Sequence, residues 1–293
     1  MEYCEAGLRS PEAKRFFLEN HTKPMLVIEA GKVGYQYWKD LWSYRELFYF
    51  LAWRDVLVRY KQTVIGVMWA VLRPLLTMIV FTVVFGKLAK MPSQGVPYPI
   101  LVFAGMLPWQ FFSTALSESS SSLISNSNLL TKVYFPRLII PTSSVIASFV
   151  DFSISFVLMF LLMIAYGVWP TWRFVFFPVF CLHALAVSIG SGLWLAALNV
   201  KYRDFRYVVP FIVQLGCYIS PVGFDSGVVP EQWRLLYSCN PMVGVIDGFR
   251  WFLLGQENFY WPGFLCSTIL TLLLLWTGIS YFRRTEGKIA DII

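Results

Sequence analysis

Six apolar segments, separated by short polar ones, constrain what this chain can fold into more than any other feature. An α-helix of about 20 apolar residues is long enough to cross the hydrocarbon core of a bilayer. Only 14% of the 293 residues are charged, which is too little polar surface for a soluble protein of this length. We therefore predict an all-α polytopic membrane protein with six transmembrane helices, over residues 66–88, 100–123, 138–166, 174–198, 208–221 and 262–282.

Two further segments are partly apolar but do not read as spans. Residues 41–62 mix aromatic and basic side chains, which is typical of an amphipathic helix lying on a membrane surface. The alternative is an ordinary surface helix of a small domain. Residues 222–261 contain Pro230 and Pro241 and are too broken to cross as one helix, so we expect one or two short re-entrant or interfacial helices there.

The chain accordingly divides into a polar N-terminal arm, the amphipathic segment and a membrane domain. We place these at residues 1–40, 41–62 and 63–293. The positive-inside rule sets the orientation of the membrane domain. With six spans, eighteen Lys and Arg residues fall on the side of the two termini, five fall on the other side, and Arg73 lies within a span. We predict a plasma-membrane protein with both termini in the cytoplasm. The net charge of +7 has the same origin and does not favour a nucleic-acid partner.

Motifs for chemistry are missing from the sequence. None of its Gly-Lys pairs stands in a GxxxxGK[ST] phosphate loop, and no serine stands in GxSxG. There is no CxxC pair, and two histidines are too few for a histidine metal centre. We expect no catalytic residue, metal or cofactor on this chain, so any ATP-driven work requires an ATPase on another chain.

Asp151 is the acidic residue placed deepest in a predicted span. An ionisable group at that depth is costly and usually faces a bundle interior or an aqueous cavity. It is read either as a pathway or gating residue or as a structural hydrogen-bonding partner of a neighbouring helix, and the sequence does not separate the two.

Aromatic residues make up 18% of the chain. Many fit the aromatic belts at the two membrane interfaces. Others lie within or at the ends of spans, where aromatic rings suit the apolar faces of sugar rings, although for any one residue lipid contact or core packing is the more common role. The candidates for lining a glycan conduit are Trp69, Tyr98, Trp109, Phe112, Trp194 and Tyr218.

Five motifs occur in an order that resembles a known family. They are FLAWRDVLVRYKQTVIGVMWAVLRPLL, VPYPILVFAGMLPWQFF, NSNLLTKVYFPRLIIP, ALNVKYRDFRYVVPFIVQ and the NPM of residues 240–242. Together, over about residues 41–285, they resemble the permease subunit of polysaccharide ABC exporters of the ABC-2 type, which move O-antigen, capsule or teichoic-acid chains. The resemblance implies that two copies of the chain pair, that two nucleotide-binding subunits carrying ATP and Mg dock below, and that a polyprenyl-diphosphate-linked glycan passes between the copies.

The resemblance also implies roles for particular segments. Residues 41–62 would be the interface helix against the ATPase, residues 126–137 the main coupling segment, and residues 221–261 the periplasmic gate helices. The implied coupling residues are Arg54, Asp55, Asn128, Lys132 and Arg137.

Basic residues near the cytoplasmic mouth form another candidate set. Arg59, Lys61 and Arg73 could attract the lipid diphosphate through charge-assisted contacts, although the positive-inside bias accounts for them equally well. Two other functions stay open: an ABC-2 permease for a small lipid or drug, and a membrane-embedded glycan or lipid transferase. The second would need clustered carboxylates or histidines, which are scarce in this sequence.

Overall fold

The computed structural model describes residues 35–61, 66–93, 95–256 and 259–292. Most of the predicted N-terminal arm, residues 1–34, therefore lies outside the described residues. The chain separates into two compact units, residues 1–42 and 43–293. Within the first unit the description covers only residues of α2 (Tyr35–Ser43).

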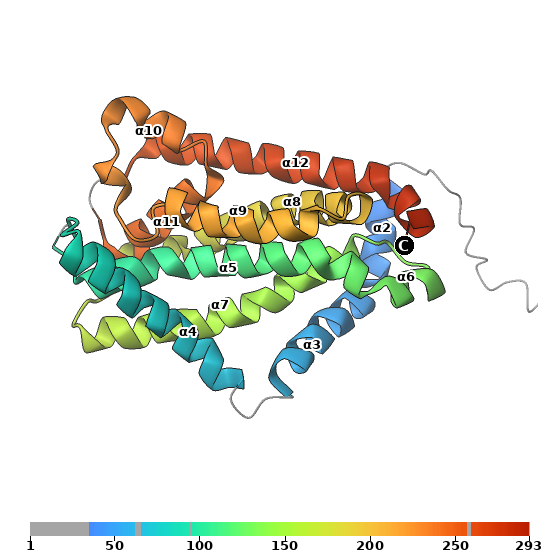
Figure 1. The fold of residues 1–293 in the computed structure, drawn as a ribbon, viewed down its shortest axis with the longest axis horizontal. Helices are drawn as coiled ribbons and strands as arrows, with labels where there is room; N and C mark the ends of the chain where they lie inside the picture. Colours follow the sequence, from blue (N-terminus) through green and yellow to red (C-terminus); the bar gives the residue numbers. More distant parts are fainter. Residues whose placement is uncertain (1–34, 62–65, 94, 257–258, 293) are drawn as a thin grey trace, which may run out of the picture. The chain divides into compact units, whose positions relative to one another are not determined.

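The second unit is built from helices, and its described residues contain no strand. Figure 1 shows their arrangement. In chain order the elements are α3 (Arg45–Lys61), α4 (Gly66–Phe81), the π-helical η1 (Thr82–Leu88), α5 (Tyr98–Ser125), α6 (Ser127–Lys132), α7 (Ile139–Ala165), η2 (Trp172–Phe176), α8 (Phe177–Lys201), α9 (Phe205–Ile219), η3 (Ser226–Val228), α10 (Glu231–Tyr237), α11 (Pro241–Leu254) and α12 (Trp261–Ile292).

Five helical stretches among the described residues are long and apolar enough to cross a membrane. They are Met68–Leu88, Tyr98–Ser125, Ile139–Ala165, Trp172–Lys201 and Trp261–Gly287. They coincide with five of the six predicted spans, which confirms an all-helical, multi-pass membrane protein.

The remaining predicted span, residues 208–221, forms the shorter apolar helix α9. Its 15 residues cover about 22 Å at 1.5 Å per residue, less than the roughly 30 Å of a bilayer core.

The predicted amphipathic helix over residues 41–62 is interrupted. α2 ends at Ser43 and α3 begins at Arg45. On α3, Leu51 is buried, whereas Tyr49 and Phe50 are 68% and 62% exposed. This helix therefore presents an apolar face that no described residue of the chain covers. Residues 222–261 contain the short 3-10 helix η3 and the helices α10 and α11, so this range is not one continuous helix.

α5 is the central helix of the second unit. It packs against α7, α8 and α11, while α12 runs along α8 (Figure 1). Its first half, from Ile100 to Leu107, is buried throughout. In its Ser-rich second half, hydroxyl groups such as those of Ser117 and Ser122 donate to carbonyls three or four residues earlier in the same helix. Those groups are satisfied locally, which lets α5 sit among apolar neighbours.

Small residues bring the long helices close together. A Cβ on Gly278 of α12 would lie 2.4 Å from the carbonyl oxygen of Gly190 in α8. A Cβ on Gly192 would lie 2.6 Å from the hydroxyl oxygen of Ser119 in α5. Helices in a membrane gain stability from such close packing, since burial from water is not available to drive them together. α8 therefore packs closely against both α5 and α12.

Candidate functional site

A charged network ties α3 to the membrane helices. The guanidinium of Arg59 forms ion pairs with Asp151 of α7 and, at 2.9 Å, with Glu118 of α5. The hydroxyl of Tyr60 donates a hydrogen bond to the other carboxylate oxygen of Asp151. Burial, and then the hydrogen bond to Asp151, raise the pKa of Tyr60, so this phenol stays a donor at neutral pH.

This network joins two residues for which the sequence predicted separate roles. Asp151 accepts hydrogen bonds from Arg59 and Tyr60, two neighbouring residues of α3. This is the contact expected if Asp151 is a hydrogen-bonding partner of a neighbouring helix. The contact binds α3 to the helices of the bundle. Arg59 faces two carboxylates, so its charge is largely neutralised within the chain. Lys61 and Arg73, the other residues predicted to attract a diphosphate, are exposed.

The predicted coupling segment is fixed at both ends. Arg54 donates to the side-chain oxygen of Asn126 at 2.8 Å and forms an ion pair with Asp55 at 2.7 Å. At the other end, the backbone N–H of Arg137 donates to the carboxylate of Glu286 at 2.7 Å, and its guanidinium donates to the Glu286 carbonyl.

Between these ends lies the short helix α6. Its residues Asn128 and Lys132 are exposed. The segment therefore connects α3 with α12 and presents α6 outward, an arrangement that can pass a displacement of α3 to the bundle.

Four of the six predicted conduit aromatics are engaged inside the chain. The hydroxyl of Tyr98 donates to the Gly223 carbonyl at 2.5 Å. Trp109 is buried where α9 crosses α5, and its ring leaves no room for a Cβ on Gly216.

Phe112 and Trp194 are likewise packed. The ring of Phe112 lies 5.5 Å from that of Trp109. Trp194 stacks on Tyr281 at 4.3 Å. In contrast, Trp69 and Tyr218 are 58% and 63% exposed, so these two are the candidates available to a substrate.

A fully buried arginine, which the sequence analysis counted only as a loop charge, organises the opposite end of α5. Arg250 of α11 donates to the carbonyls of Phe224 at 2.7 Å, Val222 at 2.9 Å and Leu101 at 3.3 Å. A Cβ on Gly105 would lie 2.6 Å from a guanidinium nitrogen, so glycine is needed there. The sequence signal was an Asp247–Arg250 spacing of three within an otherwise apolar helix, which places both charges on one face.

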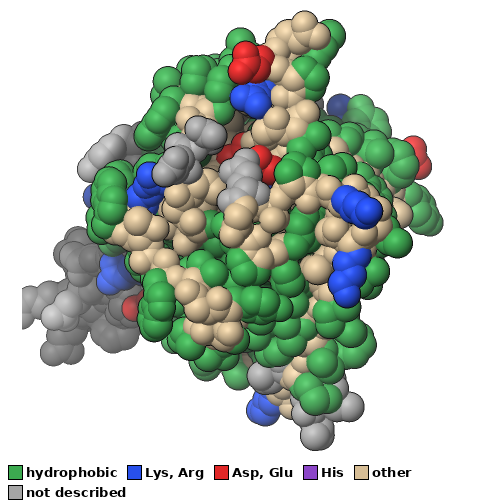
Figure 2. All heavy atoms as spheres, turned by 90° about the vertical axis from the view of Figure 1, so that its left-hand side faces the viewer, with side chains coloured by type: hydrophobic (Ala, Val, Ile, Leu, Met, Phe, Trp, Pro, Cys, Tyr) green, Lys and Arg blue, Asp and Glu red, His purple; other side chains and the backbone are tan. Residues whose placement is uncertain are grey.

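A cavity of about 640 Å³ lies beside α10 and α11. Its lining includes the carboxylates of Asp225, Glu231 and Asp247. Burial raises the pKa of Asp247 to about 6, against the opposing effects of Arg250 and of a hydrogen bond from Ser226. Figure 2 views the end of the molecule where α10 lies and shows mainly hydrophobic surface, with acidic side chains at a few places.

The charged clusters of the described ranges do not form a metal site, since no group of three His, Cys, Asp or Glu residues there is arranged to hold an ion. The clusters around Arg59 and Arg250 instead connect helices through hydrogen bonds and ion pairs.

Comparison with known proteins gives a consistent result. The family described as ABC-2 type transporter matches residues 46–254. The chain is 31% identical over 258 residues to the O-antigen export system permease protein RfbA of Myxococcus xanthus, covering 87% of this chain and 98% of that protein. It is 26% identical over 242 residues to a protein of the same name from Klebsiella pneumoniae, covering 82% of this chain and 92% of the relative.

A more distant relative is named for a different polysaccharide. The chain is 21% identical over 246 residues to the polysialic acid transport protein KpsM of Escherichia coli, covering 80% of this chain and 91% of that protein. All three relatives are thus named for the transport of a polysaccharide.

Proposed function

Because this chain belongs to the ABC-2 type transporter family, we propose that it is the channel-forming transmembrane subunit of an ATP-driven exporter that moves lipid-linked polysaccharide across the bacterial inner membrane. The observation that carries this proposal is the 31% identity to an O-antigen export permease along almost the whole of both chains. The relatives are transport permeases, so the chain acts in transport and not in bond chemistry.

The complete exporter contains two copies of this chain and two ABC nucleotide-binding subunits, which bind ATP and Mg. Two features support an ATPase partner. The sequence has no phosphate loop of its own. The exposed apolar face of α3 and the exposed helix α6 provide a docking surface for it.

The chain crosses the membrane six times, with α9 as the fifth crossing, and both termini lie in the cytoplasm. The bilayer adjusts to the short α9 by local thinning, which costs fractions of a kcal/mol per Å. The asymmetry of eighteen basic residues against five supports this orientation. α3 then lies at the cytoplasmic surface, and α10 and α11 form a re-entrant gate at the exit.

The contacts of α3 suggest how ATP binding opens the channel. Movement of the ATPase displaces α3, and the ion pairs of Arg59 pass this displacement to α5 and α7. The Arg54–Asn126 bond passes it to the coupling segment, and the contacts of Arg137 pass it to α12. In the open channel the exposed rings of Trp69 and Tyr218 contact the glycan.

Reconstitution tests this function. The chain is co-expressed with the ABC nucleotide-binding subunits encoded in the same genome, purified, and placed in proteoliposomes with a polyprenyl-diphosphate-linked glycan. We expect the ATPase to co-purify, and we expect ATP hydrolysis to rise several-fold with the glycan and protected glycan to accumulate.

The control uses an ATPase whose phosphate-loop lysine is replaced, which should abolish both readouts. Failure of any ATPase to associate would overturn the exporter assignment. Stimulation by a small lipid or drug, but not by glycan, would replace the polysaccharide with that substrate class.

A further inference from the structure

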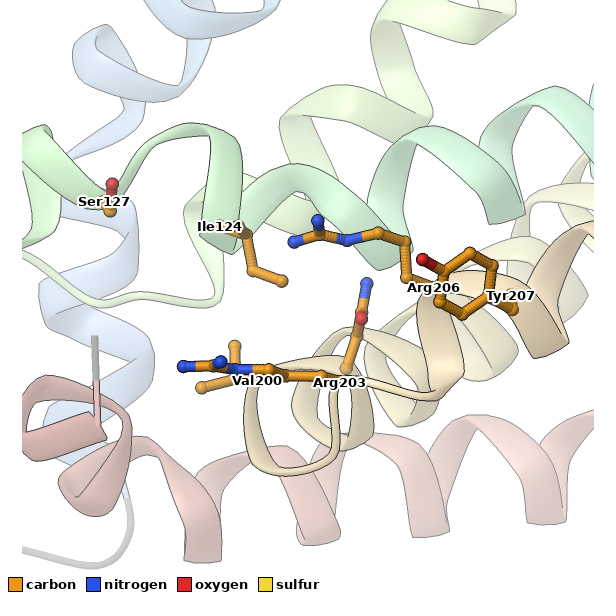
Figure 3. A pocket seen from close by; sticks show the side chains of 7 residues that line it. Ile124, Ser127, Val200, Arg203, Arg206 and Tyr207 are labelled. Carbon is orange, nitrogen blue, oxygen red and sulfur yellow. The ribbon is translucent and has the colours of Figure 1, made fainter.

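A second cavity, of about 480 Å³, opens where α8 meets α9. Its walls include Ile124 at the end of α5, Ser127 at the start of α6, Arg203 of the α8–α9 connection and Arg206 of the first turn of α9. Figure 3 shows the side chains of Arg203 and Arg206 extending toward the side where Ile124 and Ser127 lie. The volume falls within the range of small-molecule binding sites.

The two arginines are exposed, and neither has a counter-charge in the part of the chain that the structure describes. Within the described ranges, neither guanidinium takes part in an ion pair or a side-chain hydrogen bond. Arg206 lies in the first turn of α9, which carries no acidic residue, and a positive charge there is opposed by the helix dipole. Asp204 lies between them in the chain but does not line the cavity. Two such charges around one cavity are stabilised by an anion.

The cavity also offers a hydrogen-bond acceptor. Asn199 is 2% exposed and lines the cavity, and its amide nitrogen donates to the Ser120 carbonyl at 2.9 Å. Its side-chain oxygen accepts no hydrogen bond from the part of the chain that the structure describes. A buried carbonyl oxygen without a donor costs free energy, so a ligand hydroxyl would be stabilised there. The site thus combines donors for a phosphate with an acceptor for a hydroxyl.

An apolar stripe on α9 begins at this cavity. Tyr207, Phe211 and Leu215 follow at intervals of four residues, so they share one helix face. They are 80%, 63% and 46% exposed. A hydrocarbon chain attached to a phosphate in the cavity can lie along this face within the membrane. A free phosphate or nucleotide would leave the stripe unused.

We propose that this cavity, with Arg203, Arg206 and Asn199, binds the sugar-diphosphate head of the lipid-linked glycan while the polyprenyl chain lies along α9. The assignment rests on the proposed export function. It places the diphosphate at this cavity and not at Arg59, whose charge is already paired with Asp151 and Glu118. The guanidinium groups bind phosphate oxygens through charge-assisted hydrogen bonds. The carboxamide oxygen of Asn199 accepts from a hydroxyl of the first sugar.

Binding to the full chain in phosphatidylcholine nanodiscs tests the proposal. The probe is radiolabelled polyprenyl diphosphate bearing one sugar, measured with the wild type, the double variant Arg203→Gln/Arg206→Gln and the matched control Arg284→Gln. Arg284 is an exposed arginine of the C-terminal helix. We expect the double variant to bind at least tenfold more weakly, and Arg284→Gln to bind as the wild type does. All three should melt at the same temperature, because neither cavity arginine has a partner to lose.

Competition then identifies the source of the phosphate. Displacement of the probe by polyprenyl diphosphate, but not by phosphatidylglycerol, supports the proposal. Equal displacement by phosphatidylglycerol or by inorganic pyrophosphate alone would overturn it in favour of an unspecific anion site. Equal weakening in Arg284→Gln, or wild-type affinity in the double variant, would also overturn it. In those cases the wild type still binds the glycan lipid, whereas loss of all binding in the wild type would count against the export function itself.

Discussion

Arg59 of the surface helix α3 forms an ion pair with Asp151, which lies in the middle of the membrane helix α7. This contact joins α3 to a residue midway along a membrane-spanning helix. Because Glu118 of α5 shares the same guanidinium, a shift of α3 alters the surroundings of two spans at once. The pair is therefore the most direct mechanical link between the proposed motor side and the channel.

Replacing Asp151 with Asn should weaken this link without removing the side chain. The neutral amide keeps the shape but loses the ion pair, at a cost of about 1–3 kcal/mol. We expect a lower melting temperature in nanodiscs and fewer glycans exported per ATP hydrolysed. Arg284→Gln, an exposed change in α12, is the control. An unchanged ratio of export to hydrolysis in Asp151→Asn would exclude a coupling role.

Replacing Arg250 with Met should strongly destabilise the protein. Three buried carbonyls lose their donors, and the loss of a buried charge from its partners costs about 3–5 kcal/mol. Arg250→Lys keeps the charge and some donors, so its melting temperature should lie between those of the wild type and Arg250→Met. Thermal unfolding followed by near-UV circular dichroism measures the effect. The exposed Lys87→Met serves as the neutral reference, and a melting temperature equal to that reference would contradict the assignment.

The stability of the chain should depend on pH through Asp247. Its pKa in the folded protein is about 6, above the ordinary value of 3.8, so the folded state binds the proton more tightly than the unfolded chain does. The contribution of this group to stability therefore increases as the pH falls from above 6 to about 4, and levels off below. Melting temperatures measured across this range should show that rise in the wild type, and the rise should be smaller in Asp247→Asn. If melting temperature depends on pH in the same way in the wild type and in Asp247→Asn, Asp247 is not the source of the rise.

Gly278→Ala should separate helix packing from helix propensity. The added Cβ would meet the Gly190 carbonyl oxygen, so we expect α8 and α12 to part slightly and the melting temperature to drop. The Cβ added by Gly287→Ala in the same helix meets nothing within 4 Å. This change should be neutral or slightly stabilising, because alanine is more favourable than glycine in a helix by about 1 kcal/mol. Equal effects of the two changes would argue against the close contact.

Tyr218→Ala and Trp194→Ala should affect different properties. Tyr218 is exposed, so its loss should reduce glycan export several-fold with little effect on stability. Trp194 stacks on Tyr281 and donates to Thr277, so its loss should lower the melting temperature. Export assays and melting curves on the same preparations distinguish the two outcomes. A normal export rate in Tyr218→Ala would remove it from the conduit.

Hydropathy was sufficient to place the long helices, because an apolar run of that length has few alternatives to a membrane span. The break between α2 and α3 was not predicted, since one residue at Tyr44 interrupts a pattern that otherwise continues. The hydrogen-bonding partners of Asp151 could not be predicted from the sequence either. They lie about 90 positions away in the chain, and a local sequence pattern carries no information about contacts at such separations.

The roles of the aromatic residues depended on packing in the same way. Trp109 and Trp69 have similar sequence surroundings, yet one is 6% and the other 58% exposed. Arg250 left a clearer trace, because a charge in an apolar helix requires buried acceptors.

The surroundings of Arg250 constrain how the chain is assembled during synthesis. The acceptors of its guanidinium come from α5 and from the connection that precedes α10, so no segment inserted alone can accommodate the charge. α11 must therefore reach its final position after α5 is in place. A chain in which α5 is displaced would leave the guanidinium without the Leu101 carbonyl. Destabilised folds of that kind are removed by cellular proteases, so damage to α5 should lower the amount of the protein in the cell.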